Sequence, residues 1–391
     1  MPSLFTTAVH AGHLEPRPGT PSSPPIVTAS GWTYEDMEAL DAALGDPRAG
    51  YVYSRNAAPT QEAFESAVAA LENGAGAAAF ASGLAAVHAA LLAAQSAPRP
   101  TGLVAATELY GASQTLLKFL AAQGGCPLEW VDIRDLAAVK AALAPGRVLL
   151  FEVISNPLCH VADAPALIQL AHSAQARVVV DSTFTTPYLI RPLELGADFV
   201  VHSATKYLGG HGDVLGGVVV AAAETDVLAL RRTRQMLGSN LSPFDAYLAL
   251  RGLRTLGLRV REQNHNALGL AEWLADQPRV AQVQYPGLPA SPDHALARRL
   301  LPGCFGGMLA FDLRDAGRAE TFAFLERLRV VQRIPTLGDV ATLAAYPAHA
   351  SHRSLTPEQR AALGIGDGCI RLSAGIEDLA DLVEDLRQAL P

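Results

Sequence analysis

The sequence predicts an α/β protein with a mostly parallel sheet covered by helices and a smaller C-terminal α+β domain. Between residues 60 and 206, short runs of Val, Leu and Ala alternate with stretches whose apolar residues recur at helical spacing. Strands separated by helices of this length form parallel sheets that are buried on both faces. With 391 residues, 50% of them hydrophobic, the chain is long enough to enclose a second, smaller core.

The first 57 residues are expected to form an arm instead of a domain. The segment Pro16–Val27 is too rich in proline to be helical and too short to enclose a core. An arm without its own core is expected to lie on a neighbouring subunit, which predicts an oligomer. The expected divisions are an arm at 1–57, a large domain at 58–257 and a small domain at 258–391.

The large domain is predicted to alternate helices with strands. The expected helices are Glu62–Leu71, one that begins near Ser82, Gln114–Gln123, Asp135–Leu143 and Ala164–Ala174. The expected strands are Ala77–Ala81, Leu103–Thr107, Leu128–Val131, Val148–Val153, Val178–Asp181 and Asp198–His202. Ligands of such sheets bind beyond the carboxyl ends of the strands. The polar residues expected at those ends are Ser82, Tyr110, Asn156, Asp181 and Lys206.

Charge and cysteine content exclude several classes of protein. A net charge of -8 does not favour binding to nucleic acid or to an anionic membrane, and the basic cluster Arg231, Arg232 and Arg234 is interpreted as a solvated helix face. The four cysteines have no CxxC spacing, which argues against a metal cluster or a disulfide framework. The N-terminus lacks the pattern of a secretory signal, and the alanine-rich stretch Gly76–Ala94 is interpreted as a strand and a soluble helix. A cytoplasmic protein is expected.

The most informative stretch is DFVVHSATKYLGGHGDVLGG, which begins at Asp198. A short buried strand is followed by Ser203 and Thr205, then by Lys206 and a run of glycines. Hydroxyl groups can donate to a phosphate, and glycines allow close approach of the backbone. An ordinary solvated lysine is the alternative interpretation. A partly desolvated lysine in this setting is suited to form a Schiff base with a carbonyl group.

Other strand ends carry side chains that fit the same chemistry. Asp181 ends a buried run of valines, where a carboxylate needs a cationic partner; it either ties a loop or pairs with a protonated ring nitrogen of a cofactor. Ser82 either caps a helix or begins a phosphate site at the helix N-terminus. Lys206, Asp181, a ring-stacking Tyr110 and a phosphate cup at Ser82 and Gly83 together predict bound pyridoxal 5′-phosphate (PLP).

Short motifs follow one another along nearly the whole chain. They are YSR at Tyr53–Arg55, ASGLAA at Ala81–Ala86, LYG at Leu109–Gly111, NP at Asn156–Pro157, VVVDSTFTTPY at Val178–Tyr188, HSATKYLGGHGDV at His202–Val214, SPFDAYLALRGLRTLGLR at Ser242–Arg259, YPGL at Tyr285–Leu288, FGGMLAF at Phe305–Phe311 and IRLSAGIED at Ile370–Asp378. With these motifs the sequence resembles the fold-type I PLP-dependent enzymes of cysteine and methionine metabolism. That family includes cystathionine γ-synthases, cystathionine γ-lyases, methionine γ-lyases and O-acylhomoserine sulfhydrylases.

The resemblance implies a role for each candidate residue. Lys206 would hold PLP and move protons, Asp181 would pair with the pyridine nitrogen, and Tyr110 would stack on the ring. The remaining assignments are a phosphate site at Ser82, Gly83, Leu84, Ser203 and Thr205, a contribution of Tyr53 and Arg55 to the phosphate of the adjacent subunit's cofactor, and a substrate site at Asn156, Thr336 and Arg371. A strand-edge role for Arg371 is the alternative. The resemblance also implies a homotetramer built from two dimers, and no metal.

Several residues depart from the family pattern. Ala58 and Ser182 replace residues within the NPT and DNT motifs, and Ala112 stands where methionine γ-lyases usually have Cys. Pro335 replaces a Glu that is usual in members that handle cystathionine, and 337–352 looks more like the methionine γ-lyase and sulfhydrylase branch.

The expected reaction is γ-elimination from methionine, homocysteine or cystathionine, giving 2-oxobutanoate, ammonia and a thiol. Replacement on an O-acylhomoserine, as in cystathionine γ-synthases or sulfhydrylases, is the alternative.

Two other enzyme classes and one non-catalytic class compete with this interpretation. A nicotinamide-dependent oxidoreductase would need a GxGxxG after an early strand, and a metal hydrolase would need an HExxH or a carboxylate cluster; the sequence has neither. A binding or scaffold protein would not need Lys206 and Asp181 together. Bound PLP would make the purified protein yellow, which separates the interpretations.

Overall fold

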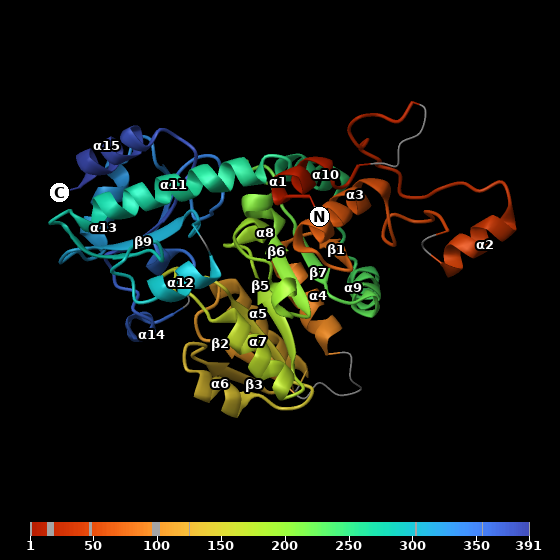
Figure 1. Ribbon diagram of the computed structural model, residues 1–391, viewed down its shortest axis with the longest axis horizontal. Coiled ribbons are helices and arrows are strands. Elements are labelled where there is room, and N and C mark those ends of the chain that lie inside the picture. Colours follow the sequence, from red (N-terminus) through yellow and green to blue (C-terminus); the bar gives the residue numbers. More distant parts are fainter. Residues whose placement is uncertain are drawn as a thin grey trace.

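The computed structural model describes residues 2–13, 19–46, 49–95, 102–124, 126–301, 303–353 and 355–390. A large body surrounds one sheet, a smaller body surrounds a second sheet, and the long helix α11 (Leu256–Ala275) runs from one to the other (Figure 1). A segment near the N-terminus projects from the large body and carries α2 (Met37–Gly45) (Figure 1). Of the proline-rich segment at 16–27, residues 16–18 lie outside the described residues.

The central sheet of the large body has seven strands in the order β1-β7-β6-β5-β4-β2-β3. Only β7 runs antiparallel to its neighbours. The strands are β1 (Gly76–Phe80), β2 (Leu103–Ala106), β3 (Leu128–Val131), β4 (Val148–Glu152), β5 (Arg177–Asp181), β6 (Phe199–Ser203) and β7 (Gly217–Ala221). Six of them were predicted to within one residue at each end. The seventh, β7, was missed because its glycine start reads as part of the loop after Lys206, although GVVVA is a buried apolar run.

Helices cover both faces of this sheet, and several of them begin at a capping residue or a proline. Asp135 and Asp163 accept hydrogen bonds from the first amides of α6 and α7, and Pro59 occupies the first turn of α3. These helices are α3 (Pro59–Glu72), α4 (Gly83–Ala94), α5 (Gly111–Gly124), α6 (Leu136–Ala142), α7 (Ala164–Ser173), α8 (Thr186–Leu189), α9 (Glu224–Leu237) and α10 (Pro243–Leu253). None of the helices within the described ranges is long and apolar enough to cross a membrane.

The interpretation of the basic cluster on α9 was wrong for one of its three arginines. Arg232 is exposed, but Arg234 is buried and forms an ion pair with the buried Glu65 of α3. Arg231 lies at the edge of the same pair, 3.9 Å from Glu65. The pair ties α9 to α3, so part of this cluster stabilises the packing of helices instead of facing solvent.

The first helix, α1 (Leu4–His10), contacts the body of its own chain. It packs on α3 and α11, and Ala8 is buried there. A Cβ atom at Gly257 would lie 2.7 Å from the ring of Phe5, which explains why glycine allows this close packing. The projecting segment therefore begins after α1 (Figure 1).

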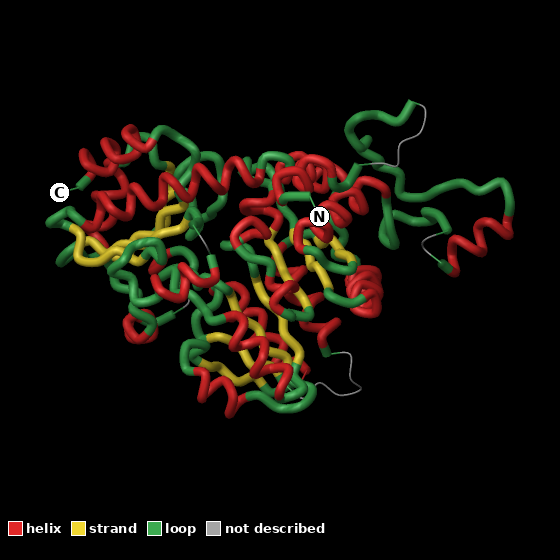
Figure 2. The backbone as a smooth tube through the Cα atoms, in the orientation of Figure 1, coloured by secondary structure: helices red, strands yellow, loops and turns green. Residues whose placement is uncertain are grey.

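The smaller body has a five-stranded sheet in the order β10-β11-β12-β9-β8. Its strands are β8 (Val280–Gln284), β9 (Met308–Leu313), β10 (Gln332–Arg333), β11 (Leu343–Ala345) and β12 (Cys369–Ser373), and its helices are α12 (His294–Leu300), α13 (Arg318–Arg327), α14 (Pro357–Ala362) and α15 (Leu379–Ala389). The tube view shows that this sheet is separate from the central one (Figure 2). Its own hydrophobic core includes Leu309, Phe311 and Leu372. The middle strand β12 carries Arg371.

Candidate active site

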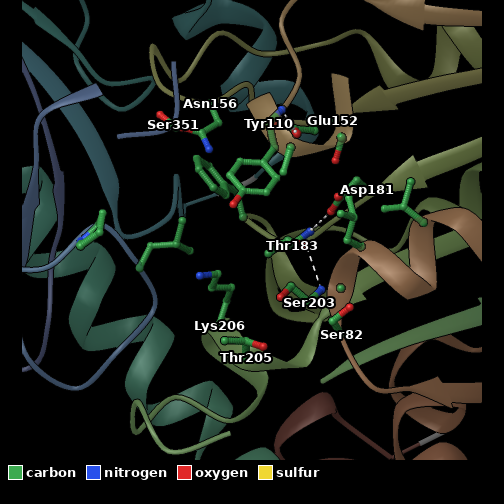
Figure 3. Close-up of a pocket in the computed structure, with 18 of the residues that line it drawn as sticks. Ser82, Tyr110, Glu152, Asn156, Asp181, Thr183, Ser203, Thr205, Lys206 and Ser351 are labelled. Atoms are coloured by element: carbon green, nitrogen blue, oxygen red, sulfur yellow. Dashed lines mark hydrogen bonds between the residues drawn. The ribbon is translucent and has the colours of Figure 1, made fainter. Parts of the chain in front are cut away.

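A cavity of about 480 Å³ lies at the carboxyl ends of β4, β5 and β6, beside the start of α4. Tyr110, Asp181 and Lys206 surround the same space (Figure 3). Residues of the small body, among them Pro335 and Arg371, line the cavity too. The predicted polar residues therefore lie together beyond the carboxyl ends of the strands, as expected for a parallel sheet.

Lys206 lies in a single π-type turn, Ala204–Leu208, that directly follows β6. Its own backbone leaves the helical conformation, with φ at -94° and ψ at -133°. The Nζ atom donates to Oγ1 of Thr336 at 2.5 Å. Burial, together with the positive charge of Arg371, lowers the pKa of Lys206 to about 8. The neutral amine is therefore far more populated near neutral pH than in an ordinary lysine, as a nucleophilic lysine requires.

Asp181 ends β5 and accepts a hydrogen bond from the main-chain N–H of Thr183 at 3.0 Å. Burial raises the pKa of this carboxyl group. Within the part of the chain that the structure describes, Asp181 has no Lys, Arg or His side chain at ion-pair distance. The Asp181 carboxylate therefore lacks the cation that a buried charge needs, and a protonated ring nitrogen would supply it.

The start of α4 has the shape of an anion site. The Ser82 hydroxyl accepts from the main-chain N–H of Ala85 at 3.1 Å, so this hydroxyl is an N-cap. A Cβ atom at Gly83 would lie 2.8 Å from Oγ of Ser203, so glycine allows α4 to approach the end of β6. The hydroxyl of Thr205 is paired with Gly216, donating to its carbonyl at 3.2 Å and accepting from its N–H at 3.0 Å. The helix N-terminus with the Ser203 hydroxyl fits a phosphate.

Arg371 is buried in the middle of β12, paired with Ala345 of β11 and Ala310 of β9, so it is not a strand-edge residue. Its Nη1 donates to Oδ1 of Asn156 at 3.0 Å and its Nη2 to the carbonyl of Thr336 at 2.9 Å. Its Nε has no hydrogen-bond partner among the described residues. Since guanidinium carries five N–H donors, several remain for a carboxylate ligand.

Tyr53 and Arg55 are not brought to this cavity within the same chain. Both are exposed at the end of the projecting segment, where they line a separate hollow with Asn240. The side chain of Asn240 donates to the carbonyl of Arg55 at 2.9 Å, which fixes the end of the segment. Leu84, in contrast, lines the cavity.

The structure adds cavity residues that were not predicted as site residues. They are Val87, Ser113, Glu152, Ile154, Thr183, Phe184, Leu215, Leu337, Ala350 and Ser351. Glu152 accepts from the main-chain N–H of Tyr110 at 2.8 Å, and both residues lie at the top of the view in Figure 3. The signal that could have indicated Glu152 is its place at the carboxyl end of the strand beside that of Asp181.

These side chains fit PLP in three separate ways. The amine of Lys206 suits an aldehyde, the unpaired carboxylate of Asp181 suits a ring N–H, and the start of α4 suits a phosphate. Tyr110 is 45% exposed beside the cavity, with its ring free to contact a planar ligand. No group of three or more potential metal ligands occurs within the described ranges.

Comparisons with known proteins agree with this geometry. The family model for the Cys/Met metabolism PLP-dependent enzymes matches residues 5–391. The chain is 42% identical to an L-methionine gamma-lyase of Pseudomonas putida over 100% of this chain and 98% of the relative, and 39% identical to an O-succinylhomoserine sulfhydrylase of Pseudomonas aeruginosa over 98% and 94%. A crystal structure of cystathionine gamma synthase from Xanthomonas oryzae pv. oryzae in complex with cystathionine is similar, with a TM-score of 0.92 and 40% identity over 100% of this chain and 98% of that one. The chain therefore belongs to the PLP-dependent enzymes of cysteine and methionine metabolism.

Proposed function

We propose that the protein is a carbon–sulfur lyase that catalyses γ-elimination from methionine, homocysteine or cystathionine, giving 2-oxobutanoate, ammonia and a thiol. The observation that carries this proposal is the apolar wall of the cavity. Among the described residues that line it, the acidic and basic ones are Glu152, Asp181, Lys206 and Arg371. Pro335 stands where an acidic side chain would bind the distal amino group of cystathionine. A pocket of this kind favours an apolar thioether.

Lys206 and Asp181 are the proposed catalytic pair. PLP supplies an electron sink that weakens bonds at the carbon atoms of an attached amino acid. The Nζ of Lys206, with its pKa lowered to about 8, can accept and return a proton near neutral pH. The hydroxyl of Thr336 fixes the position of this amine by accepting its hydrogen bond. Asp181 supplies the negative charge that keeps the pyridine nitrogen protonated.

Arg371 is the proposed anchor for the substrate carboxylate. Its guanidinium is oriented by Asn156 and by the carbonyl of Thr336, and Thr336 also contacts Lys206. These contacts would hold the carboxylate end of a substrate at a fixed place relative to the amine of Lys206. Tyr110 is proposed to stack on the cofactor ring and assist proton transfer, and Gly83, Leu84, Ser203 and Thr205 to surround the phosphate.

The active site is proposed to be shared between subunits of a cytoplasmic homotetramer built as a pair of dimers. Tyr53 and Arg55 lie on a projecting segment and do not line the cavity of their own chain. In the proposed assembly their exposed side chains reach a neighbouring copy, where Arg55 would contact the phosphate of that subunit's PLP. The exposed ring of Tyr110 would then be covered in the assembly.

The alternative function is γ-replacement on an O-acylhomoserine. It is supported by the near-equal identity of the chain to a sulfhydrylase and to cystathionine γ-synthases, one of them from Mycobacterium bovis at 40%. Steady-state assays of the holoenzyme decide between the two. The value of kcat/KM for elimination from methionine and homocysteine is compared with that for an O-acylhomoserine plus cysteine or sulfide. We expect elimination to exceed replacement, and a replacement rate a hundredfold higher would overturn the proposal.

A further inference from the structure

The cavity contains a second buried carboxyl group, Glu152, which has no part in the roles proposed above. Its residue is 6% exposed at the carboxyl end of β4. Glu152 and Asp181 are register partners in the parallel pair β4 and β5. Their side chains therefore leave the sheet on the same face, from strands about 4.8 Å apart. Two ionised carboxylates so close in a buried site would repel one another, which favours the protonated form of one of them.

Two other buried glutamates have basic partners, which Glu152 lacks. Glu65 is paired with Arg234, and Glu72 contacts Nε2 of His202 at 2.6 Å. Glu152 has no basic side chain at ion-pair distance in the described ranges, and its Oε2 has no hydrogen-bond partner there. Burial and the charge of Asp181 together raise the pKa of Glu152 well above its usual range.

We propose that Glu152 is a positioning residue that, as a neutral carboxylic acid, fixes the main chain at Tyr110 and Asn156 and leaves Asp181 as the single carboxylate charge beside the cofactor. This inference rests on the proposed function, because it assigns Glu152 to the support of the cofactor site.

The contacts of Glu152 join two sides of the cavity. Its Oε1 accepts from the main-chain N–H of Tyr110 at 2.8 Å, and the main-chain N–H of Asn156 faces the same carboxyl group. The side chain of Asn156 accepts from Arg371 at 3.0 Å. Because the ring of Tyr110 is 45% exposed, its place over the cavity depends on its main chain. One buried group therefore supports both the stacking residue and the partner of the carboxylate anchor.

The neutral state also serves Asp181. The groups that face Glu152 with a charge are Asp181 of β5 and Glu108 at the end of β2, and both oppose its ionisation. If Glu152 were ionised, its charge would raise the proton affinity of Asp181. Asp181 would then compete with the pyridine nitrogen for the proton that keeps the ring cationic. A proton held on Glu152 removes this competition.

The protonation state is tested directly by infrared spectroscopy on the holoenzyme at neutral pH. The difference spectrum between wild type and Glu152→Gln is expected to contain the carbonyl stretch of a protonated carboxylic acid. Glu129→Gln is the matched control, because Glu129 lies on β3 of the same sheet and pairs with Arg147 at a half-exposed position. Its difference spectrum is expected to contain the bands of an ionised carboxylate.

The positioning role is tested by the visible circular dichroism of bound PLP and by the rate at which PLP is lost on dialysis. Glu152→Gln is expected to resemble wild type in both, because the amide oxygen can accept from Tyr110 and the amide carries no charge. Glu152→Ala leaves a buried N–H unpaired, and we expect PLP loss about tenfold to a hundredfold faster with an altered dichroism band.

Three results would overturn the inference: an ionised-carboxylate band in the Glu152→Gln difference, a Gln variant as damaged as the Ala variant, or an Ala variant like wild type. If the Ala variant does not fold, the infrared spectrum still tests the protonation state of Glu152, and the Gln variant still tests its positioning role. Wild type without PLP on Lys206 would contradict the proposed function. A charged Glu152 beside normally bound PLP would contradict this inference alone.

Discussion

Replacing Arg371 tests the link between the carboxylate anchor and the reactive amine. Arg371→Met removes the guanidinium that contacts Asn156 and Thr336, whereas Arg371→Lys keeps the charge but loses the planar fork. Removing one member of a buried, hydrogen-bonded charge pair costs about 2 to 5 kcal/mol, so kcat/KM for methionine should fall about 30-fold to 5,000-fold in the Met variant. For the carboxamide of methionine, which lacks the negative charge, kcat/KM should fall far less in the Met variant.

The same variants make a prediction about pH. The charge of Arg371 contributes to the low pKa of Lys206, after burial itself, so Arg371→Met should raise that pKa above about 8 and Arg371→Lys should leave it near 8. The neutral amine is the form that captures PLP, so the rate of PLP uptake by apoprotein should rise through this pKa and level off above it. The midpoint should move to higher pH in the Met variant. An unchanged midpoint together with unchanged discrimination between methionine and its carboxamide would refute the reasoning.

The remaining predictions concern the ring nitrogen, the subunit interface and specificity. Asp181→Asn should lower kcat by orders of magnitude while the melting temperature changes little, and near-normal turnover would remove Asp181 from the mechanism. Homomers of Arg55→Ala and of Lys206→Ala should each be nearly inactive, but mixing them under subunit exchange should restore some activity; no recovery would mean that the segment serves its own subunit. Pro335→Glu should raise kcat/KM for cystathionine relative to methionine, and an unchanged ratio would show that this wall does not select the substrate.

Local sequence patterns were enough to predict those residues of the candidate site that lie at or directly after the end of a strand. Asp181 follows three valines, and Lys206 follows a buried strand and precedes glycines, so each position could be interpreted from its neighbours. The contact between Arg371 and Asn156 joins residues 215 positions apart, and no local pattern encodes it. The resemblance to the family supplied it instead.

Packing decided the residues that the sequence did not predict. Arg234 resembles its exposed neighbour Arg232 in sequence, but it lies one helical turn from Arg231 on the face that meets Glu65. Glu152 ends an apolar strand like an ordinary boundary residue. Its importance became visible only when β4 was placed beside β5, with the two carboxyl groups in register.

Reduction of the purified holoenzyme with borohydride, followed by peptide mapping, tests the central claim most directly. Borohydride makes the bond between PLP and its lysine permanent, so the position of the pyridoxyl label identifies the residue. The label is expected on the peptide that contains Lys206 and should be absent from Lys206→Ala. A label on another lysine, or an unlabelled and colourless protein, would contradict the account.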